Sequence, residues 1–347
     1  MMRRGTVRSG RALLVLILVL LLLGASWGAS PWLRERTTAT LCALNSCANT
    51  SCLHGIGAAS SPAGASPQAR LSTVFLIVLE NHNWADLAGN RSAPYLNHVL
   101  LPQASHTAQY YNPPGLHPSL PNYLWLEAGS NCGVLDDNPP ADNHQPTPAH
   151  LVTLLARDGI SWRAYEENIN GQTCPLTAAY PYTPKHNPFV YFDDVTGKNN
   201  PRSPTCIAHV RPYGELGSAL SRDTVSRYNV ITPNLCNDGH DACAPLNDPI
   251  RQTDAWLARA VPPILHAATY HRDGVLFITW DEGEGGADGP IGLLALSPRA
   301  KGHGYTSTVH YTHSSLLRTV QEIFGVRPLL GDARRATDLR DLFTALP

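Results

Sequence analysis

Two unbroken runs of apolar, largely β-branched residues constrain the fold of this chain most strongly. Residues Thr73 to Leu79 read TVFLIVL, and residues Val275 to Trp280 read VLFITW. A strand buried on both faces of a parallel sheet has this pattern, whereas a half-exposed strand alternates apolar and polar residues. Ile291 to Leu296 has the same character, and Tyr228 to Thr232 and Ser161 to Tyr165 are weaker strand candidates. The sequence therefore predicts a sheet with buried parallel strands.

Helical patterns alternate with these strands. Leu151 to Arg157 stops at Asp158-Gly159, and Thr253 to His271 and Ser314 to Phe324 are the clearest helices. Apolar strands that alternate with helices predict a layered α/β domain. The Pro- and Asn-rich stretches 130–150 and 170–215 are expected to be covering loops.

The composition supports a large core and argues against several classes of protein. Apolar residues make up 43% of the 347 residues, and charged residues only 15%, below the roughly 25% of an average soluble domain. The net charge is −1 and there is no lysine-rich run, which argues against a nucleic-acid binder that neutralises phosphates. The sequence has no internal repeat, which argues against a coiled coil and a solenoid.

The N-terminal residues carry the pattern of an export signal. Four arginines precede an apolar run from Ala12 to Gly24, which is typical of a secretory signal and shorter than the roughly 20 residues of a membrane-spanning helix. We expect residues 1–30 to be a signal peptide or an N-terminal membrane anchor. Residues 31–71, rich in Ala, Ser and Pro, are expected to be a spacer, followed by one folded domain over 72–347. The protein is thus expected to be secreted or anchored to the outer face of the cytoplasmic membrane.

The eight cysteines agree with export, because disulfides persist outside the reducing cytoplasm. Cys236 with Cys243 would close a short loop, and Cys174 with Cys206 a longer one, although spacing alone does not fix the connectivity. The evenly spaced cysteines near the N-terminus lack the CxxC pair or histidine of a zinc site, so disulfides or free thiols are expected there. The cysteines outside these two pairs are Cys42, Cys47, Cys52 and Cys132.

Acidic and amide side chains follow the two strongest strands directly. Glu80 and Asn81 come after the first strand, and Asp281 and Glu282 after the second. Ligands bind beyond the carboxyl ends of the strands in open α/β sheets. Carboxylates placed together there repel one another unless a cation compensates their charge. The presence of both clusters favours a divalent metal site. The alternative is that each cluster is an ordinary polar turn that follows a strand.

Ser119 lies in the segment HPSLPNY, which opens a predicted helix ending at about Ala128. Its position is that of an N-cap, with a proline inside the first turn. The functional alternative is a nucleophile at the positive end of a helix, where free N–H groups favour a phosphate. Several histidines stand in polar, loop-like settings, among them His186, His240 and His313, and each is a candidate metal ligand, oxyanion contact or proton donor.

Seven segments, taken in order, resemble the phosphoesterase family that includes bacterial acid phosphatases and phosphatidylcholine-type phospholipases C. That family belongs to the alkaline-phosphatase-like superfamily. The segments are VFLIVLENHNW (74–84), HPSLPNYLWLEAG (117–129), GISWRAYEENI (159–169), KHNPFVYF (185–192), ITPNLCNDGHD (231–241), LFITWDEGEGG (276–286) and YTHSSLLRTVQEIFG (311–325). The resemblance implies an α/β, alkaline-phosphatase-like layered fold, with a mostly parallel central sheet and helices on both faces.

The resemblance also implies a metal centre and a nucleophile. Ser119 would be the metal-activated nucleophile and would form a phospho-enzyme intermediate that water later hydrolyses. One divalent metal ion would be held by Glu80, Asn81, Asp281 and Glu282.

The resemblance further implies the surroundings of the phosphate. Asn122 would help to hold the phosphoryl oxygens. His186 and His240 would line the phosphate pocket as catalytic residues, one of them as general acid. His117 and His313 would be further substrate contacts.

Two departures from the superfamily narrow the expected activity. The additional Asp and His ligands of its two-zinc members are missing, so a single Ca²⁺, Mg²⁺, Mn²⁺ or Zn²⁺ ion is expected. Tyr123 stands where sulfatases need an arginine, which disfavours sulfate esters. The expected activity is that of an acid phosphatase-like phosphomonoesterase acting on a small phosphate ester. A phospholipase C that cleaves phospholipid head groups and a non-catalytic binding protein on the same fold are the alternatives, and the oligomeric state stays open.

Overall fold

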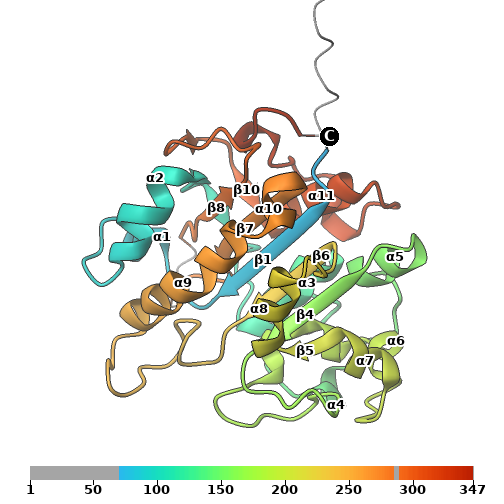
Figure 1. Cartoon of the computed structure of the whole chain (residues 1–347). Helices are drawn as coiled ribbons and strands as arrows, with labels where there is room; N and C mark the ends of the chain where they lie inside the picture. Colours follow the sequence, from blue (N-terminus) through green and yellow to red (C-terminus); the bar gives the residue numbers. More distant parts are fainter. Residues whose placement is uncertain (1–69, 285–288, 347) are drawn as a thin grey trace, which may run out of the picture. The chain divides into compact units, whose positions relative to one another are not determined.

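An eight-stranded sheet runs through the part of the chain that the structure, a computed structural model, describes: residues 70–284 and 289–346 (Figure 1). The expected export signal and nearly all of the expected spacer lie outside these residues. In sheet order the strands are β5 (Val210–Pro212), β4 (Trp162–Glu166), β6 (Tyr228–Thr232), β1 (Thr73–Leu79), β7 (Gly274–Trp280), β8 (Leu293–Leu296), β2 (Ser105–Thr107) and β9 (Thr306–Ser307).

The five strands from β5 to β7 are parallel, as the apolar runs predict. β1 lies between β6 and β7 and is buried along its whole length. β4 joins β6 and β5 in the same direction. The sequence-predicted strand at 291–296 forms β8, which starts at Leu293 and runs antiparallel to β7. An apolar run predicts that a strand is buried but not in which direction it runs, so the sequence pattern did not predict that β8 is antiparallel to β7.

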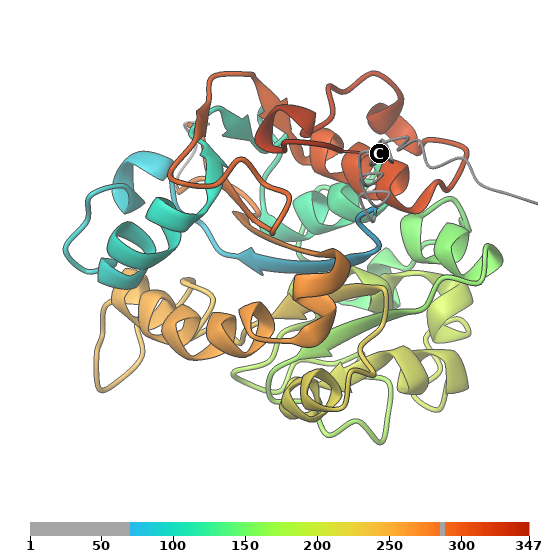
Figure 2. The same cartoon turned by 45° about the horizontal axis from the view of Figure 1, so that its top comes forward.

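Helices cover both faces of the sheet, as expected. The helices α3 (Ser119–Ala128), α5 (Leu151–Arg157) and α11 (His313–Phe324) contact one another on one face. The helices α8 (Gly214–Ser221), α9 (Pro249–Leu265) and α10 (Ala268–Asp273) lie on the other face. Figure 2 shows α9 below β1, with α3 and α11 above it.

The helix predicted over Thr253 to His271 is two helices in the structure. α9 starts earlier, with Asp248 as its N-cap, and ends at Leu265, and α10 begins at Ala268. Pro262 and Pro263 remove two backbone donors from the last turn of α9. Ala267 then takes an extended conformation, which separates the two helices.

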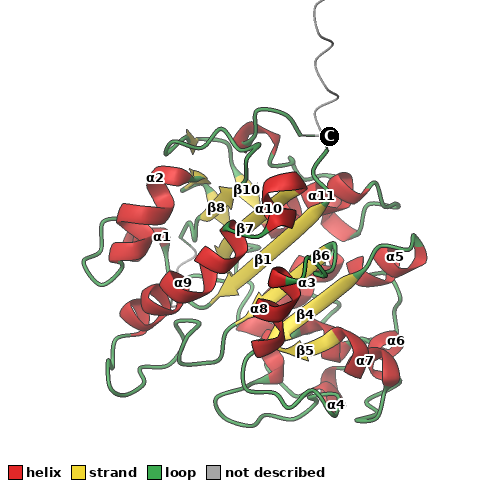
Figure 3. Ribbon diagram, viewed as in Figure 1, coloured by secondary structure: helices red, strands yellow, loops and turns green. Residues whose placement is uncertain are grey.

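The remaining elements are short and lie mostly in the connecting segments (Figure 3). The expected covering loops 130–150 and 170–215 hold several of them, and the Cys174–Cys206 disulfide closes the second loop. The Cys236–Cys243 disulfide is also present, so both expected pairs are confirmed. These short elements are α1 (Trp84–Leu87), η1 (Leu96–Leu100), α2 (Leu101–Gln103), β3 (Tyr110–Tyr111), α4 (Pro140–Asn143), η2 (Pro184–His186), η3 (Pro188–Tyr191), α6 (Asp193–Thr196), α7 (Pro204–His209), β10 (Tyr311–Thr312), η4 (Gly331–Arg334) and η5 (Arg340–Leu342).

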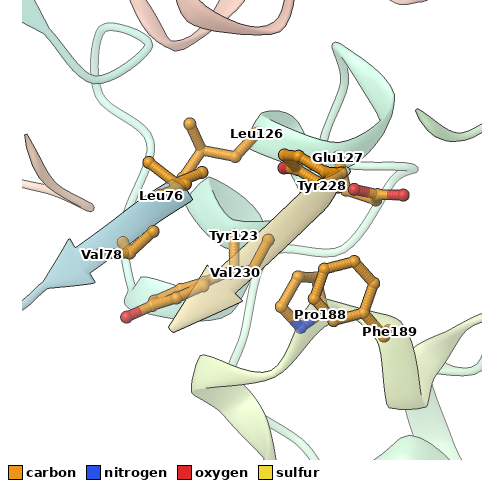
Figure 4. A pocket seen from close by; sticks show the side chains of 9 residues that line it. All are labelled: Leu76, Val78, Tyr123, Leu126, Glu127, Pro188, Phe189, Tyr228 and Val230. Carbon is orange, nitrogen blue, oxygen red and sulfur yellow. The ribbon is translucent and has the colours of Figure 1, made fainter. Parts of the chain in front are cut away.

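α3 packs closely onto the sheet. A cavity of about 10 Å³ separates it from β1 and β6, roughly the space of one water molecule. Figure 4 shows Tyr123 on α3 lining this cavity with Val78 and Val230. Gly129 ends the helix in a left-handed conformation, where a Cβ atom would come within 2.7 Å of the Leu330 carbonyl oxygen. The middle and the C-terminal end of α3 are therefore held close against their surroundings.

No helix within the described ranges combines the length and the apolar character that a membrane crossing needs. The core of the domain includes Leu71, the last residue of the expected spacer.

Candidate active site

Two neighbouring parallel strands deliver three carboxylates to one edge of the sheet. Leu79 of β1 is paired with Trp280 of β7, so Glu80 and Asp281 leave the sheet side by side. The Asp281 N–H donates to the Leu79 carbonyl at 2.9 Å, which extends the ladder by one residue. The side chains of Glu80, Asp281 and Glu282 are all buried. The structure thus brings together the two acidic clusters that sequence reasoning singled out.

Burial and mutual repulsion oppose the ionisation of this cluster. Burial, together with the charges of Glu80 and Glu282, raises the pKa of Asp281 well above its usual value. Burial also raises the pKa of Glu282, to about 7, against the opposing effect of His117. Asp281 Oδ2 is buried without a hydrogen-bond partner among the described residues. A divalent cation would compensate both the unmet charge and the unpartnered oxygen.

Asn81 brings its side-chain amide to this group. Its backbone is left-handed, with φ 39°, which turns the side chain back toward the carboxylates. One end of its amide group lies 2.8 Å from Glu80 Oε2 and 3.1 Å from Asp281 Oδ1. With nitrogen at that end, the amide donates to both carboxylates. With a cation bound, the amide can turn its oxygen to that end and join the carboxylates as a ligand, so these residues fit the predicted metal centre.

Ser119 directs its hydroxyl at this cluster. Its Oγ donates a hydrogen bond to Glu80 Oε2 at 3.0 Å, and the side chain is buried. Ser119 is the first residue of α3, and Pro118 occupies the N-cap position. The expected N-cap role is therefore wrong, because the hydroxyl bonds to Glu80 rather than to the backbone of its own helix.

The same face of α3 carries two more contacts. Residues three and four positions apart on a helix share a face, so Asn122 and Tyr123 lie beside Ser119. Asn122 Nδ2 donates to Glu282 Oε2 at 3.1 Å. The Tyr123 hydroxyl donates to Glu80 Oε1 at 2.6 Å. Sequence reasoning did not assign Tyr123 to the site, although its spacing from Ser119 was a sufficient signal.

His186 lies between two buried carboxylates. Its Nε2 is 3.2 Å from Glu80 Oε1, and its Nδ1 is 3.1 Å from Asp238 Oδ2. Burial lowers the pKa of His186, but the charge of Glu80 and the hydrogen bond with Asp238 outweigh it and raise the pKa to about 10. The imidazole is thus a cation that donates from Nδ1 to Asp238 and forms an ion pair with Glu80 through Nε2. Against burial, the charge of His186 and the hydrogen bond from Tyr123 lower the pKa of the Glu80 carboxyl.

His240 stands at the more open side of the site. Its Nδ1 is 2.7 Å from Asp241 Oδ1, and 29% of the side chain is exposed. Its loop docks on β1 through Asp238, whose carbonyl accepts the Glu80 N–H. Glu80, His186 and His240 also bring one potential ligand atom each within 4.8 Å of one another. Because His186 is a cation paired with two carboxylates, it would repel a metal ion, and the oxygen cluster is the better cation site.

The other two sequence-predicted histidines also reach the acidic cluster. His117 Nδ1 lies 2.5 Å from Glu282 Oε2, and 29% of the His117 side chain is exposed. His313 is fully buried, with Nε2 2.6 Å from the Asp281 carbonyl oxygen and Nδ1 3.0 Å from the Tyr110 hydroxyl. Burial lowers the pKa of His313 to about 4, so its ring is neutral and Nε2–H donates to the carbonyl. His313 therefore supports the backbone of Asp281 from behind the cluster.

The amino-acid sequence is similar to those of known phosphatases. The chain matches the Phosphoesterase family over residues 97–327. It is 29% identical to a phosphatidylinositol-3-phosphatase of Mycobacterium tuberculosis, over 81% of this chain and 88% of that protein. It is also 29% identical to a probable acid phosphatase of Kluyveromyces lactis, over 60% of this chain, and it spans about half (47%) of that relative.

The fold also occurs among solved structures. A protein of the alkaline phosphatase superfamily from Vibrio parahaemolyticus superposes with a TM-score of 0.53, over 81% of this chain and 74% of that protein. The sequence identity is 9%, so this likeness concerns the fold alone. The expected α/β layered architecture is confirmed.

Proposed function

The chain belongs to the Phosphoesterase family, and on that premise we propose that it is an exported, metal-dependent phosphomonoesterase with Ser119 as its nucleophile. Membership makes the protein a hydrolase of phosphoric ester bonds. The two relatives are both named as phosphatases, which supports a monoester substrate. Two disulfides and the apolar N-terminal run behind its arginines support export.

One observation carries the proposal: the Ser119 hydroxyl donates to Glu80 within a buried cluster of carboxylates. A serine hydroxyl is a weak nucleophile at neutral pH and needs a base or a metal to lose its proton. An ordinary structural serine at the start of a helix would cap that helix instead. The hydrogen bond from the Ser119 hydroxyl to Glu80 therefore supports a role for Ser119 as the nucleophile.

The metal ion would be held by oxygen atoms of Glu80, Asn81, Asp281 and Glu282. This set suits Ca²⁺, Mg²⁺ and Mn²⁺, and Zn²⁺ stays a candidate. A bound divalent ion would stabilise the serine alkoxide and the negative charge that develops on the phosphoryl group. His313 would hold Asp281 in place through the hydrogen bond to its carbonyl.

In the first step Ser119 Oγ attacks the phosphorus atom and gives its proton to Glu80 Oε2. The bond between phosphorus and the alcohol oxygen breaks, and the departing oxygen takes a proton from His240. We assign this proton to His240 rather than His186, because His240 is partly exposed while His186 is buried between two carboxylates. Asn122 would help to hold the phosphoryl oxygens, and His117 lies beside it on Glu282.

In the second step water attacks the phosphoserine and gives a proton to His240. The bond between phosphorus and Ser119 Oγ breaks, and Oγ recovers its proton from Glu80. The products are the alcohol and inorganic phosphate, and every side chain returns to its starting state. General acid–base transfer of this kind contributes about 10²–10⁴ in rate.

The test is hydrolysis of p-nitrophenyl phosphate from pH 4 to 9, with the metal removed by EDTA and each divalent ion then restored. We expect turnover that one or more ions restore, and its loss in Ser119→Ala. Ser218→Ala is the matched control, because Ser218 is an exposed serine on another helix, α8. Turnover unaffected by EDTA contradicts the metal dependence, and near-normal turnover in a folded Ser119→Ala protein removes Ser119 as nucleophile.

A phospholipase C is the second candidate, because two exposed apolar side chains stand close to the site. Leu135 and Tyr180 are the most exposed large apolar side chains of the described residues, at 68% each. Leu135 lies two residues before Asp137, which contacts α3. The Tyr180 hydroxyl touches the Cys236–Cys243 disulfide, which brackets His240. Apolar side chains in such places suit a substrate presented at a lipid surface.

Release of phosphocholine from phosphatidylcholine vesicles tests this candidate. A phospholipase C releases it, and Leu135→Ser with Tyr180→Ser lowers the release while hydrolysis of p-nitrophenyl phosphate is unchanged. Val309→Ser, at an exposed apolar position in another loop, is the control. An enzyme that hydrolyses p-nitrophenyl phosphate and leaves the vesicles intact excludes the phospholipase.

A further inference from the structure

Lys185 is a partly buried cation at the border of the site, and the mechanism above does not use it. Its side chain is only 18% exposed. The ammonium nitrogen lies 2.9 Å from Asp137 Oδ2 and 3.3 Å from His240 Nε2. Lys185 directly precedes His186 on η2, so the element that places His186 against Glu80 also places the ammonium.

Asp137 ties Lys185 to the helix that carries the nucleophile. While Oδ2 binds the ammonium, Oδ1 accepts a hydrogen bond from the backbone N–H of Leu120 at 2.9 Å. Leu120 directly follows Ser119. One carboxylate therefore fixes the distance between the lysine and the first turn of α3.

The ammonium has donor capacity to spare. Lysine offers three N–H donors: one points to Asp137, and His240 Nε2 accepts a second only after it has given up its proton. Burial disfavours the charge, but Asp137 and Glu80 outweigh it and raise the pKa of Lys185 above its usual value. A cation with an unused donor, linked through Asp137 to the helical turn that carries Ser119, suits an anionic oxygen.

We propose that Lys185 binds a terminal oxygen of the substrate phosphate and thereby favours monoesters over diesters. A monoester phosphate carries about 1.5 to 2 negative charges at pH 7 and three acceptor oxygens. A diester has a second ester link in place of one of these oxygens and loses part of the charge. The Lys185 ammonium would bind the more highly charged monoester phosphate more strongly, and Asp137 holds the ammonium in position. The inference rests on the proposed function.

Lys185→Met removes the charge at similar length, and Lys185→Arg restores it. Lys301→Met is the matched control, because Lys301 also pairs with an aspartate, Asp341, at 2.8 Å. Lys301 follows β8, whose direction is opposite to that of β7, so it lies toward the other edge of the sheet. Each protein is assayed with p-nitrophenyl phosphate and bis(p-nitrophenyl) phosphate, and its affinity for inorganic phosphate is measured by calorimetry with the metal present.

We expect Lys185→Met to lower kcat/KM for the monoester about 10-fold or more, as loss of a charge-assisted hydrogen bond does. The diester rate should change much less, phosphate should bind more weakly by a similar factor, and Lys185→Arg should recover part of both losses. Equal losses for both esters, or unchanged phosphate affinity, would overturn the role of Lys185. Because calorimetry requires no turnover, this outcome is distinct from a wild-type protein that hydrolyses neither ester, which would instead overturn the proposed function.

Discussion

Tyr123 is expected to control the affinity of the site for its metal ion without taking part in the chemistry. Its hydroxyl donates to Glu80 Oε1 at 2.6 Å, whereas His186 Nε2 lies 3.2 Å from the same oxygen. Tyr123 therefore makes the shorter of these two contacts with Oε1, while Ser119 donates to Oε2. Its ring stacks on His186, with centroids 5.3 Å apart. Tyr123→Phe keeps this stacking and removes only the hydroxyl.

The expected loss of metal affinity in Tyr123→Phe follows from the charge on Glu80. A hydrogen bond to a charged group is worth about 1.5–3 kcal/mol. Loss of a partner that orients a metal ligand typically lowers metal affinity about 10–100-fold. Because His186 still holds Glu80 in the variant, we expect a loss of about 2 kcal/mol, which corresponds to an affinity about 30-fold weaker. The turnover number at saturating metal should change less than the metal affinity, because Tyr123 donates to Oε1 of Glu80 whereas Ser119 donates to Oε2.

The assay is competition for the activating metal ion against a chromophoric chelator, followed by kinetics at saturating metal. Tyr305→Phe is the matched control, since the Tyr305 hydroxyl also donates to a carboxylate, Asp341 Oδ2, at 2.9 Å. It should leave metal affinity unchanged. A Tyr123→Phe protein with wild-type metal affinity would show that Glu80 does not need this hydrogen bond, and the assignment of Glu80 as a ligand would lose its support.

Two further predictions concern stability. Replacing Cys174 and Cys206 by serine opens a loop with a sequence separation of 32, and loop-closure entropy predicts that this lowers the free energy of unfolding by about 4 kcal/mol. The same change at Cys236 and Cys243, with a separation of 7, should lower it by about 2 kcal/mol. Urea denaturation measures both losses, and the opposite order would contradict the prediction. His150 is buried between two carboxylates that outweigh burial and raise its pKa from 6.5 to about 9, so its stabilisation is complete below pH 6.5 and about 3 kcal/mol is lost as the pH rises through 9. His150→Gln should flatten this fall, and an unchanged pH dependence refutes the assignment.

The strands that carry the site could be predicted from the sequence because their pattern leaves few alternatives. β1 matches its prediction residue for residue, and β7 differs by one residue at its start. Both are apolar throughout, and the acidic clusters at their ends meet because the two strands are neighbours in register. β8 was predicted as a strand, but its antiparallel direction depends on the route of the chain between the two strands, which an apolar run does not encode.

The local geometry of the nucleophile was only partly predictable. An N-cap and a first helical residue differ by one position, and the sequence around Ser119 fits both. Glu80 decides between them, because it offers the hydroxyl a buried charged acceptor. Sequence patterns rarely contain this kind of information, since the two residues lie on different elements far apart in the chain.

Contacts between loops escaped sequence reasoning altogether. Asp238 lies in a segment that resembles the family, yet its hydrogen bond to His186 joins residues 52 positions apart. Asp137 lies in a loop without a periodic pattern, and its link to Lys185 exists only in the folded chain. Tyr123 is the exception, because helical spacing from Ser119 would have placed it on the same face.

The stereochemical course at phosphorus tests the central claim most directly. A phosphate monoester made chiral with oxygen isotopes is hydrolysed by the metal-loaded protein, and the configuration of the phosphoryl group transferred to an acceptor alcohol is determined. Attack by Ser119 followed by release from the phosphoserine inverts the configuration twice, so the account predicts net retention. Net inversion would mean that the acceptor attacks the substrate directly, and it would contradict a phospho-enzyme on Ser119.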